Sequence, residues 1–296
     1  PYTILYFCEN KKRGMILIAE SGSTKTDWVV SDGIVTSHLK TAGINPQIGL
    51  VERVTRELSS WINGVADANA IDEIYYYGAG IMHGEKAEQL KSLFISMFPN
   101  AKVELQSDIV AAAKATCGDS PGIVAILGTG SNSCFWNGQE STMHTPALGY
   151  VLGDEGGGAY IGRRLLSDYF KGVMPKPAAE AFAATYGITE EEVVRRVYTE
   201  PYPNRYMASY VRFIADNRTL PGMQELTEEC FSEFIKRNLH SYPVGKYPVN
   251  FVGSISVAFR TWLENACRKY SVTVGKVIAS PIEELAKYHI MKKYGI

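Results

Sequence analysis

Small, hydroxyl-bearing and basic residues gather in the stretch ESGSTKTDW at residues 20–28. This turn is not a P-loop, because Thr24 rather than glycine precedes Lys25, and an apolar strand pattern follows instead of a helix. A hairpin with the tip Ser21–Thr26 fits the pattern. Glycine permits a close approach and clustered backbone N–H groups bind anions, so the tip could hold phosphate groups. A tight hairpin without a ligand is the alternative.

A second stretch, ILGTGSNS at residues 126–133, repeats this chemistry. Each half of the chain opens with an apolar strand pattern and a Gly/Ser/Thr tip. A strand containing Trp28 or Trp136 then leads to Asp-Gly or Asn-Gly. This similarity suggests an internal duplication. Two such tips could hold one polyphosphate from two sides. We therefore give ligand binding and a plain hairpin equal weight as interpretations.

Carboxylates and glycines mark three further candidate sites. Asp108 opens an Ala-rich helix pattern, where a carboxylate either caps exposed N–H groups or acts as a general base. The run GDEGGG at residues 153–158 places Asp154 and Glu155 among glycines that cost backbone entropy, so we favour a ligand site there. The strand pattern before Gly253 and Ser254 predicts either a plain strand-to-helix turn or a backbone surface for adenine.

Alternating β and α patterns must position these residues. We predict strands at Ile16–Ala19, Asp27–Ser31, Ile34–Leu39, Asp72–Tyr77, Lys102–Leu105, Ile123–Leu127, Ser133–Trp136, Val249–Val252 and Val272–Ile278. We predict helices at 49–65, 85–98, 109–116, 158–171, 176–186, 190–197, 205–216, 223–238, 255–269 and 281–288. The loop at 118–122 separates an N-terminal domain, 15–117, from a C-terminal domain with helical insertions, 118–296. Residues 1–14 are interpreted as an extension, with an edge strand at 2–7 as the alternative.

Composition excludes several classes of protein. The 296 residues include 30 basic and 31 acidic side chains and 46% apolar residues, which is ordinary globular composition and favours neither nucleic acid nor membrane. No apolar run reaches the length of a membrane span, so we expect a cytoplasmic protein. The five cysteines are widely spaced and odd in number, so we expect them to be reduced and mostly buried rather than zinc-binding.

Five motifs together resemble the sugar kinase, Hsp70 and actin superfamily, and within it the BadF/BadG/BcrA/BcrD-type ATPases that include N-acetylglucosamine kinase. The motifs are ESGSTKTDW, LQSDIVAAAKA, ILGTGSNS, GYVLGDEGGGAYIG and VGSISVAF, and they occur in the family's order across residues 15–290. The resemblance implies an α/β protein with two ribonuclease H-like, actin-like ATPase domains that close over Mg²⁺ and ATP in an interdomain cleft.

The resemblance also assigns roles to residues. It implies that ATP phosphates bind Ser21, Gly22, Ser23, Thr24, Lys25, Thr26, Gly128, Thr129, Gly130 and Ser131, and that adenosine binds Gly253, Ser254, Val257 and Ala258. It implies sugar contacts at Asn45, Gly78, Ala79, Gly80, Asp108, Gly128 and Asp154. Asp108 would be the catalytic base and a metal-side carboxylate. The reaction would be transfer of the γ-phosphoryl group to an amino sugar, at O6 of N-acetylglucosamine, and a homodimer is compatible with it.

Two residues depart from the family pattern. Glu20 stands where the first phosphate loop begins with Asp, and its extra methylene predicts a contact with Mg²⁺ through water. Leu148 stands where animal N-acetylglucosamine kinases have Trp, so this position does not itself specify an N-acetyl group.

Two other functions fit the same fold. An activator of a 2-hydroxyacyl-CoA dehydratase would need a cysteine in a Gly-rich turn to hold an iron–sulfur cluster, and Cys117 and Cys134 lack that context. A non-catalytic, nucleotide-gated interaction protein would keep the phosphate loops but would have no use for Asp108 or GDEGGG.

Overall fold

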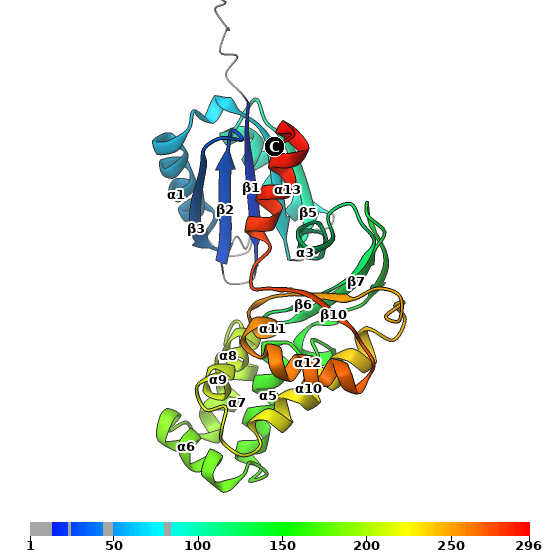
Figure 1. The fold of residues 1–296 in the computed structure, drawn as a ribbon. Coiled ribbons are helices and arrows are strands. Elements are labelled where there is room, and N and C mark those ends of the chain that lie inside the picture. Colours follow the sequence, from blue (N-terminus) through cyan, green and yellow to red (C-terminus); the bar gives the residue numbers. More distant parts are fainter. Residues whose placement is uncertain (1–13, 23–24, 44–49, 80–83) are drawn as a thin grey trace, which may run out of the picture. The chain divides into compact units, whose positions relative to one another are not determined.

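A computed structural model describes residues 14–296 except 23–24, 44–49 and 80–83 (Figure 1). It divides into two units. One comprises the residues up to Ala111 together with Ile282–Ile296, and the other comprises Ala112–Pro281. The predicted boundary at 118 lies close to this division. Residues 282–296, which the sequence analysis assigned to the second domain, instead pack in the first unit. The suggested strand at 2–7 lies outside the described residues.

The first unit contains a five-stranded sheet in the order β3-β2-β1-β4-β5. Its strands are β1 (Met15–Ser21), β2 (Lys25–Ser31), β3 (Thr36–Ala42), β4 (Ile71–Gly78) and β5 (Lys102–Ser107). The first three strands pair antiparallel, whereas β1, β4 and β5 run parallel. Ile16–Ala19 are fully buried, as expected for a central strand covered on both faces.

The second unit repeats this topology. Its sheet has the order β10-β9-β6-β7-β8, which matches the first sheet when it is read from the other edge. The strands are β6 (Gly122–Leu127), β7 (Ser131–Trp136), β8 (Ser141–Thr145), β9 (Val249–Val252) and β10 (Val274–Ile278). Again three strands form an antiparallel meander and the others pair parallel. The two sheets therefore share one topology, which is consistent with the duplication that the repeated sequence pattern suggested.

Helices cover both sheets. The first unit has α1 (Leu50–Val65), a 3₁₀ turn (Ala68–Ala70), α2 (Glu85–Met97) and α13 (Ile282–Tyr294); α3 (Asp108–Cys117) spans the division. The second unit has α4 (Gly149–Leu152), α5 (Gly158–Phe170), α6 (Lys176–Tyr186), α7 (Glu190–Tyr198), α8 (Pro203–Ser209), α9 (Val211–Asp216), α10 (Met223–Asn238), α11 (Ser254–Ala258) and α12 (Arg260–Lys269). α13 packs against β1 and β2. Across the described residues, no helix combines the length and apolar character that crossing a bilayer requires.

Some predicted boundaries differ from the structure. The predicted helix at 255–269 is two helices, because Phe259 leaves helical geometry (φ −116°, ψ 32°) and stacks its buried ring on Trp262 with ring centroids 5.2 Å apart. The helix predicted at 205–216 is likewise divided, at Tyr210. Strand β8 was not predicted, because its sequence STMHT is mostly exposed and lacks the alternation of a half-buried strand.

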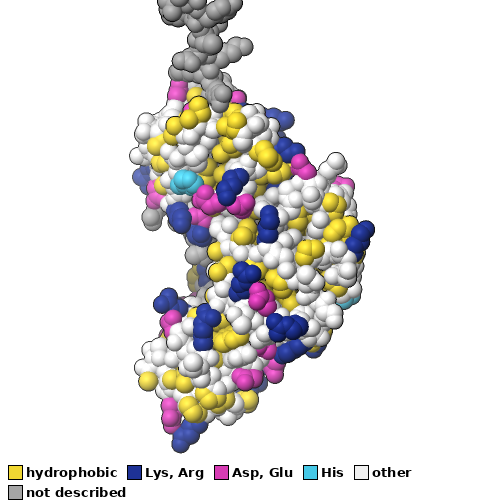
Figure 2. Space-filling view, viewed as in Figure 1, with side chains coloured by type: hydrophobic (Ala, Val, Ile, Leu, Met, Phe, Trp, Pro, Cys, Tyr) yellow, Lys and Arg dark blue, Asp and Glu magenta, His cyan; other side chains and the backbone are white. Residues whose placement is uncertain are grey.

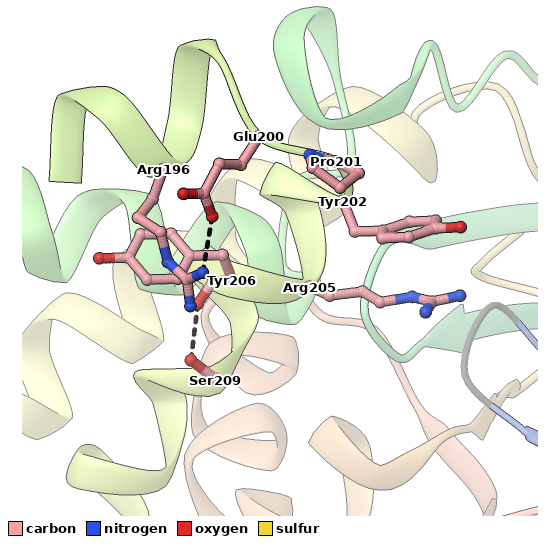
Figure 3. Close-up of a pocket in the computed structure, with 7 residues that line it drawn as sticks. All are labelled: Arg196, Glu200, Pro201, Tyr202, Arg205, Tyr206 and Ser209. Atoms are coloured by element: carbon pink, nitrogen blue, oxygen red, sulfur yellow. Dashed lines mark hydrogen bonds and ion pairs between the residues drawn. The ribbon is translucent and has the colours of Figure 1, made fainter. Parts of the chain in front are cut away.

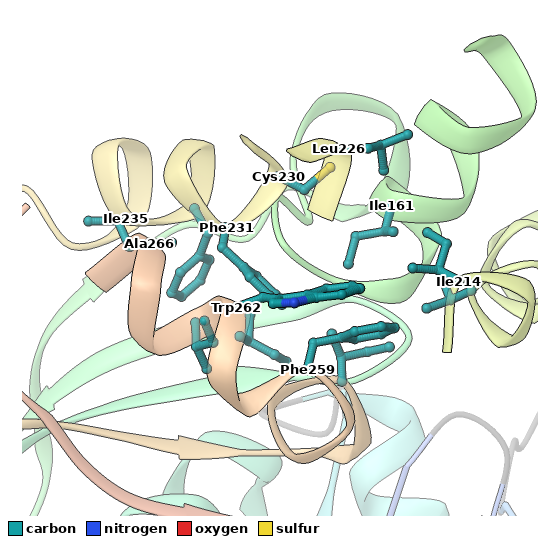
Figure 4. Close-up of a cluster of buried hydrophobic side chains, with 14 of the residues drawn as sticks. Ile161, Ile214, Leu226, Cys230, Phe231, Ile235, Phe259, Trp262 and Ala266 are labelled. Carbon is teal, nitrogen blue, oxygen red and sulfur yellow. The ribbon is translucent and has the colours of Figure 1, made fainter. Parts of the chain in front are cut away.

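Each unit has its own aromatic core. In the first, Trp28 packs edge-on against Phe94 with centroids 6.1 Å apart. In the second, Phe231, Phe259 and Trp262 lie in one apolar cluster formed by α5, α9, α10, α11 and α12 (Figure 4). Outside the cores, acidic and basic side chains are interspersed over the visible face, in keeping with the near-neutral composition (Figure 2).

Candidate functional site

The first phosphate-loop hairpin joins β1 to β2. Glu20 pairs with Asp27 and Ser21 pairs with Thr26 across the antiparallel ladder. The hydroxyls of Ser21 and Thr26 are 2.8 Å apart, and the Gly22 N–H donates to the Lys25 carbonyl at 2.9 Å. These contacts confirm a hairpin rather than a strand-to-helix P-loop. Two predicted phosphate-binding residues at the tip, Ser23 and Thr24, lie outside the described residues.

Neighbouring strands bring further candidate residues to this end of the sheet. Ser21 on β1 is in register with Gly78 on β4, and Gly78 with Ser107 on β5. The Ala79 N–H donates to the Ser21 carbonyl at 3.2 Å. Asp108 follows Ser107 directly and begins α3. Because β1, β4 and β5 are parallel, their carboxyl ends gather these residues at one edge. Asn45 and Gly80, both predicted sugar contacts, lie outside the described residues.

Asp27 is a functional candidate that the sequence analysis missed. Its side chain is buried, and Oδ2 accepts from Lys25 Nζ at 2.6 Å. Oδ1 is buried without a hydrogen-bond donor among the described residues, since Lys40 Nζ is 3.8 Å away. A buried carboxylate oxygen without a donor is costly, which makes it a ready ligand for a cation. The signal was available in the sequence, because a two-strand register places residue 27 opposite residue 20.

Negative charge accumulates around Glu20. The pKa of its carboxyl is raised to about 7, mainly by burial and then by the charges of Asp27 and Asp108, and Lys25 opposes the shift. No group of three His, Cys, Asp or Glu residues in the described part of the chain forms a ready metal cage. Mg²⁺ usually keeps several waters and takes one or two carboxylates plus substrate phosphates. The residues present therefore fit a hydrated divalent cation next to Glu20 and Asp27.

Of the two roles that the sequence left open for Asp108, the structure shows a contact that resembles a helix cap. Asp108 Oδ1 accepts from the Ile109 N–H at 2.8 Å, at the first turn of α3. The side chain is half-buried and raises the pKa of Glu20, so Asp108 belongs to the same cluster of carboxylates as Glu20 and Asp27. Proton transfer to this carboxylate stays a prediction.

The second phosphate-loop hairpin is tied to helix α5. Gly128 N–H donates to the Gly130 carbonyl at 3.0 Å, which closes the tip. The first N–H groups of α5 donate back to the tip, from Gly158 to Gly128 and from Ala159 to Thr129, each at 2.8 Å. This hairpin and the GDEGGG segment therefore form one unit.

Packing accounts for the glycine run, whose cost in backbone entropy led the sequence analysis to favour a ligand site. A Cβ on Gly157 would lie 2.6 Å from the Gly130 carbonyl carbon, and a Cβ on Gly130 would lie 2.7 Å from Asp154 Oδ1. Asp154 has φ 56° and accepts from the Ser131 N–H at 3.0 Å. Burial raises the pKa of Asp154; the bond from Ser131 opposes this shift and Glu155 adds to it. Asp154 thus orders the hairpin, and its predicted sugar contact stays a prediction.

The predicted adenosine motif lies against the same hairpin. Gly253 has φ 126°, and a Cβ there would lie 2.2 Å from the Leu127 carbonyl oxygen, so only glycine fits. Ser254, the first residue of α11, is exposed, Val257 is 44% exposed, and Ala258, the last residue of the helix, is half-buried. An exposed apolar side chain beside open backbone is compatible with a flat base, which keeps adenosine binding as a prediction.

Four of the five cysteines lie in the described part of the chain. Cys134, Cys230 and Cys267 are buried and Cys117 is half-buried, and none of the four forms a disulfide among the described residues. Burial raises the pKa of Cys230 and of Cys267 to about 12, which keeps both thiols protonated. These thiols behave as core side chains, as the sequence predicted; Cys8 lies outside the described residues.

Comparison with solved structures identifies relatives of the whole chain. A candidate N-acetylglucosamine kinase of Porphyromonas gingivalis is 39% identical, with a TM-score of 0.86 over 93% of this chain and 98% of that chain. The chain belongs to the N-acetylglucosamine kinase-like family. A candidate N-acetylglucosamine kinase of Chromobacterium violaceum, which is 20% identical, shares the fold, with a TM-score of 0.68 over 93% of this chain and 98% of that chain.

A more distant neighbour shares the fold of the N-acetylglucosamine kinase-like family. A ROK family glucokinase of Streptomyces griseus, solved with glucose and AMPPNP, is 13% identical, with a TM-score of 0.55 over 93% of this chain and 98% of that chain. No protein-family model and no curated protein matches the chain. The fold is therefore that of the sugar kinase, Hsp70 and actin superfamily, and the family is one of phosphotransferases.

Proposed function

We propose that the protein is an ATP-dependent kinase that transfers the γ-phosphoryl group to O6 of an amino sugar such as N-acetylglucosamine. The observation that carries this proposal is the 39% identity with the Porphyromonas gingivalis protein over almost the whole of both chains. The carboxylate group at the first hairpin and the glycine-lined second hairpin supply the residue types that phosphoryl transfer needs.

The first hairpin is proposed to hold the metal side of the nucleotide. Glu20, through a water, and Asp108 are the predicted metal-side carboxylates, and the structure adds Asp27, whose Oδ1 has no hydrogen-bond donor among the described residues. Mg²⁺ at this place would neutralise charge on the phosphate oxygens. The ion pair between Lys25 Nζ and Asp27 Oδ2, at 2.6 Å, orients the lysine side chain. We propose that its ammonium group contacts a phosphate.

Asp108 is proposed as the general base. As the sugar hydroxyl oxygen attacks the γ-phosphorus, its proton passes to the Asp108 carboxylate, and the bond between the γ-phosphorus and the bridging oxygen breaks to release ADP. The position of Asp108 at the first turn of α3 fixes the side chain near the carboxyl ends of β1 and β4. Catalysis would come mainly from this positioning.

The sugar contacts remain proposals. Gly78 and Ala79 in the first unit and Gly128 and Asp154 in the second are the predicted residues within the described part of the chain. Asp154 is 9% exposed, and a buried carboxylate that accepts from a sugar hydroxyl discriminates strongly against analogues that lack it. A cytoplasmic location, where ATP is available, and a homodimer are further proposals.

A sugar panel tests the proposed reaction. The purified chain, ATP and Mg²⁺ are incubated with N-acetylglucosamine, N-acetylmannosamine, glucosamine and glucose, and ADP release is measured against a blank without sugar. We expect release with one amino sugar and none with its 6-deoxy analogue. ADP release that is equal with and without every sugar would contradict a kinase and support a plain ATPase.

A further inference from the structure

A pocket of about 310 Å³ in the helical part of the second unit is lined by none of the residues predicted to bind ATP or sugar. It lies between the end of α7 and the first turns of α8, and it is lined by two arginines, two tyrosines and one carboxylate among other residues (Figure 3). The guanidinium groups of Arg196 and Arg205 carry two positive charges against the single negative charge of Glu200. The pocket is therefore electropositive.

The two arginines differ in their partners. Arg196 Nη1 donates to Glu200 Oε2 at 2.6 Å, and its guanidinium lies over the Tyr206 ring. The other carboxylate oxygen of Glu200 is taken by Arg195. Arg205 Nε, by contrast, is buried and has no hydrogen-bond acceptor among the described residues. A buried guanidinium N–H without an acceptor is costly, so Arg205 is suited to an anion that the chain does not supply.

Tyr202 orients Arg205. The guanidinium carbon lies 4.3 Å from the centre of the Tyr202 ring, and both side chains extend in the same direction, away from the Arg196–Glu200 pair (Figure 3). Tyr202 has φ 62° and ψ 46°, a left-handed conformation that non-glycine residues rarely adopt, and Pro203 follows it. Stacking on a ring covers one face of the guanidinium and leaves its edge for a planar pair of oxygen acceptors.

The position of α8 within the second unit favours the nucleotide as the source of that anion. Arg205 and Ala208 are three residues apart, so they share one face of α8. A Cβ on Gly158 would lie 3.2 Å from Ala208 Cβ, 3.3 Å from the Gly128 carbonyl oxygen and 3.5 Å from Ile255 Cδ1. Ala208, about one helical turn from Arg205 on α8, therefore packs close to Gly158, where α5 meets the second phosphate-loop hairpin and α11.

We propose that this pocket binds a phosphoryl group, held by the Arg205 guanidinium stacked on Tyr202, and that its occupant is the phosphate chain of the nucleotide. The phosphoryl site rests on the pocket itself; its assignment to ATP rests on the proposed function. Sugar phosphates offer the same chemistry, so the experiment must separate these two sources.

Calorimetric titration of the full chain tests the proposal. ATP, adenosine and glucosamine 6-phosphate are each titrated, without acceptor sugar, into the wild type, Arg205→Ala, Arg205→Lys and Arg196→Ala. We expect Arg205→Ala to raise the Kd for ATP about tenfold or more and Arg205→Lys to raise it less, because a charge-assisted bidentate contact is lost or weakened. Adenosine binding should not change. Arg196→Ala, which removes the same charge from a paired arginine, should change the Kd for ATP less than threefold.

The outcomes are separable. Unchanged ATP affinity and unchanged glucosamine 6-phosphate affinity in Arg205→Ala, with a native circular dichroism melt, would overturn the proposal while leaving the kinase function intact. Weaker binding of glucosamine 6-phosphate alone would support the phosphoryl site and overturn its assignment to the nucleotide. Loss of phosphate affinity in Arg205→Ala, in a chain that phosphorylates no sugar, would support the pocket and refute the proposed function.

Discussion

The two phosphate-loop hairpins have the same topology but are held in different ways. In the first, Glu20 and Asp27 face each other on paired strands, and Asp27 Oδ1 lacks a hydrogen-bond donor among the described residues. In the second, the tip has no such charge group. Its backbone is fixed by two N–H groups of α5 and by Asp154, which accepts from Ser131. The first hairpin thus places carboxylates opposite each other, and the second packs its backbone closely against the start of α5.

The contrast has an energetic basis. Like charges opposite each other in a sheet destabilise the fold, and a raised pKa for Glu20 is the expected response. In the second hairpin, Gly157 packs so closely on Gly130 that a Cβ would lie 2.6 Å from a backbone atom, and no pair of like charges faces across the described strands β6 and β7. Substitutions in the first hairpin should therefore change turnover and pH dependence, and those in the second should change the free energy of unfolding.

The largest effect is expected from the carboxylate group of the first unit. Asp108→Asn should lower turnover about a hundredfold or more, the usual range for a lost general base, because the amide cannot accept the hydroxyl proton. ATP and sugar affinities and the melting temperature should stay close to wild type, since the amide oxygen can still accept from the Ile109 N–H. Steady-state kinetics with calorimetry measures both, and near-normal turnover would reduce Asp108 to a helix cap.

Substitutions that affect the second hairpin should instead lower the free energy of unfolding. Gly157→Ala places a Cβ 2.6 Å from backbone atoms of Gly130, and overpacking of this kind costs about 1–3 kcal/mol in the free energy of unfolding. The matched control is Gly64→Ala on α1, where a Cβ meets nothing within 4 Å and a gain of about 0.5–1 kcal/mol is expected. Calorimetric unfolding compares the two. Equal stability of both variants would mean that the glycine run is not required for packing.

Two substitutions of Asp154 distinguish a structural role of this residue from a role in sugar binding. Asp154→Ala removes the acceptor for Ser131 N–H and places alanine at φ 56°, so we expect a loss of about 1–3 kcal/mol in stability. Asp154→Asn keeps an oxygen acceptor and tolerates this φ, so its stability should stay within about 0.5 kcal/mol. If Asp154 binds the sugar, Asp154→Asn should still weaken sugar affinity by about tenfold. Unchanged sugar affinity in a stable Asp154→Asn protein would remove Asp154 from the sugar site.

The smallest effect concerns pH. The folded-state pKa of Glu20, about 7, lies above its ordinary value of 4.5, so the folded protein binds more protons in this window and its stability falls as pH rises from about 5 to 7.5. With solvent screening taken into account, the free energy of unfolding should fall by about 1–2 kcal/mol over this pH range. Glu20→Gln should flatten this part of the profile, and Mg²⁺ should stabilise the wild type at pH 8 more than the variant. Identical pH profiles would remove Glu20 from the charge group.

Local patterns predicted most of the elements, and the paired Gly/Ser/Thr tips predicted the duplication. The apolar run at Ile16–Ala19 and the Asp-Gly and Asn-Gly turns are local signals, which is why they were readable. The break at Phe259 and the return of α13 to the first unit depend on packing between distant segments. The reason for the glycines of GDEGGG needed the contact with Gly130, whereas the position of Asp27 opposite Glu20 follows from the register of the predicted hairpin.

The central claim is phosphoryl transfer to a sugar, and ³¹P NMR of the reaction tests it most directly. ATP, Mg²⁺ and the amino sugar preferred in the panel are followed with wild type and with Asp108→Asn. We predict that wild type forms ADP and a sugar phosphomonoester in equal amounts with little inorganic phosphate, and that Asp108→Asn forms neither on the same time scale. ADP and inorganic phosphate in equal amounts, with no phosphomonoester from any sugar, would contradict the account.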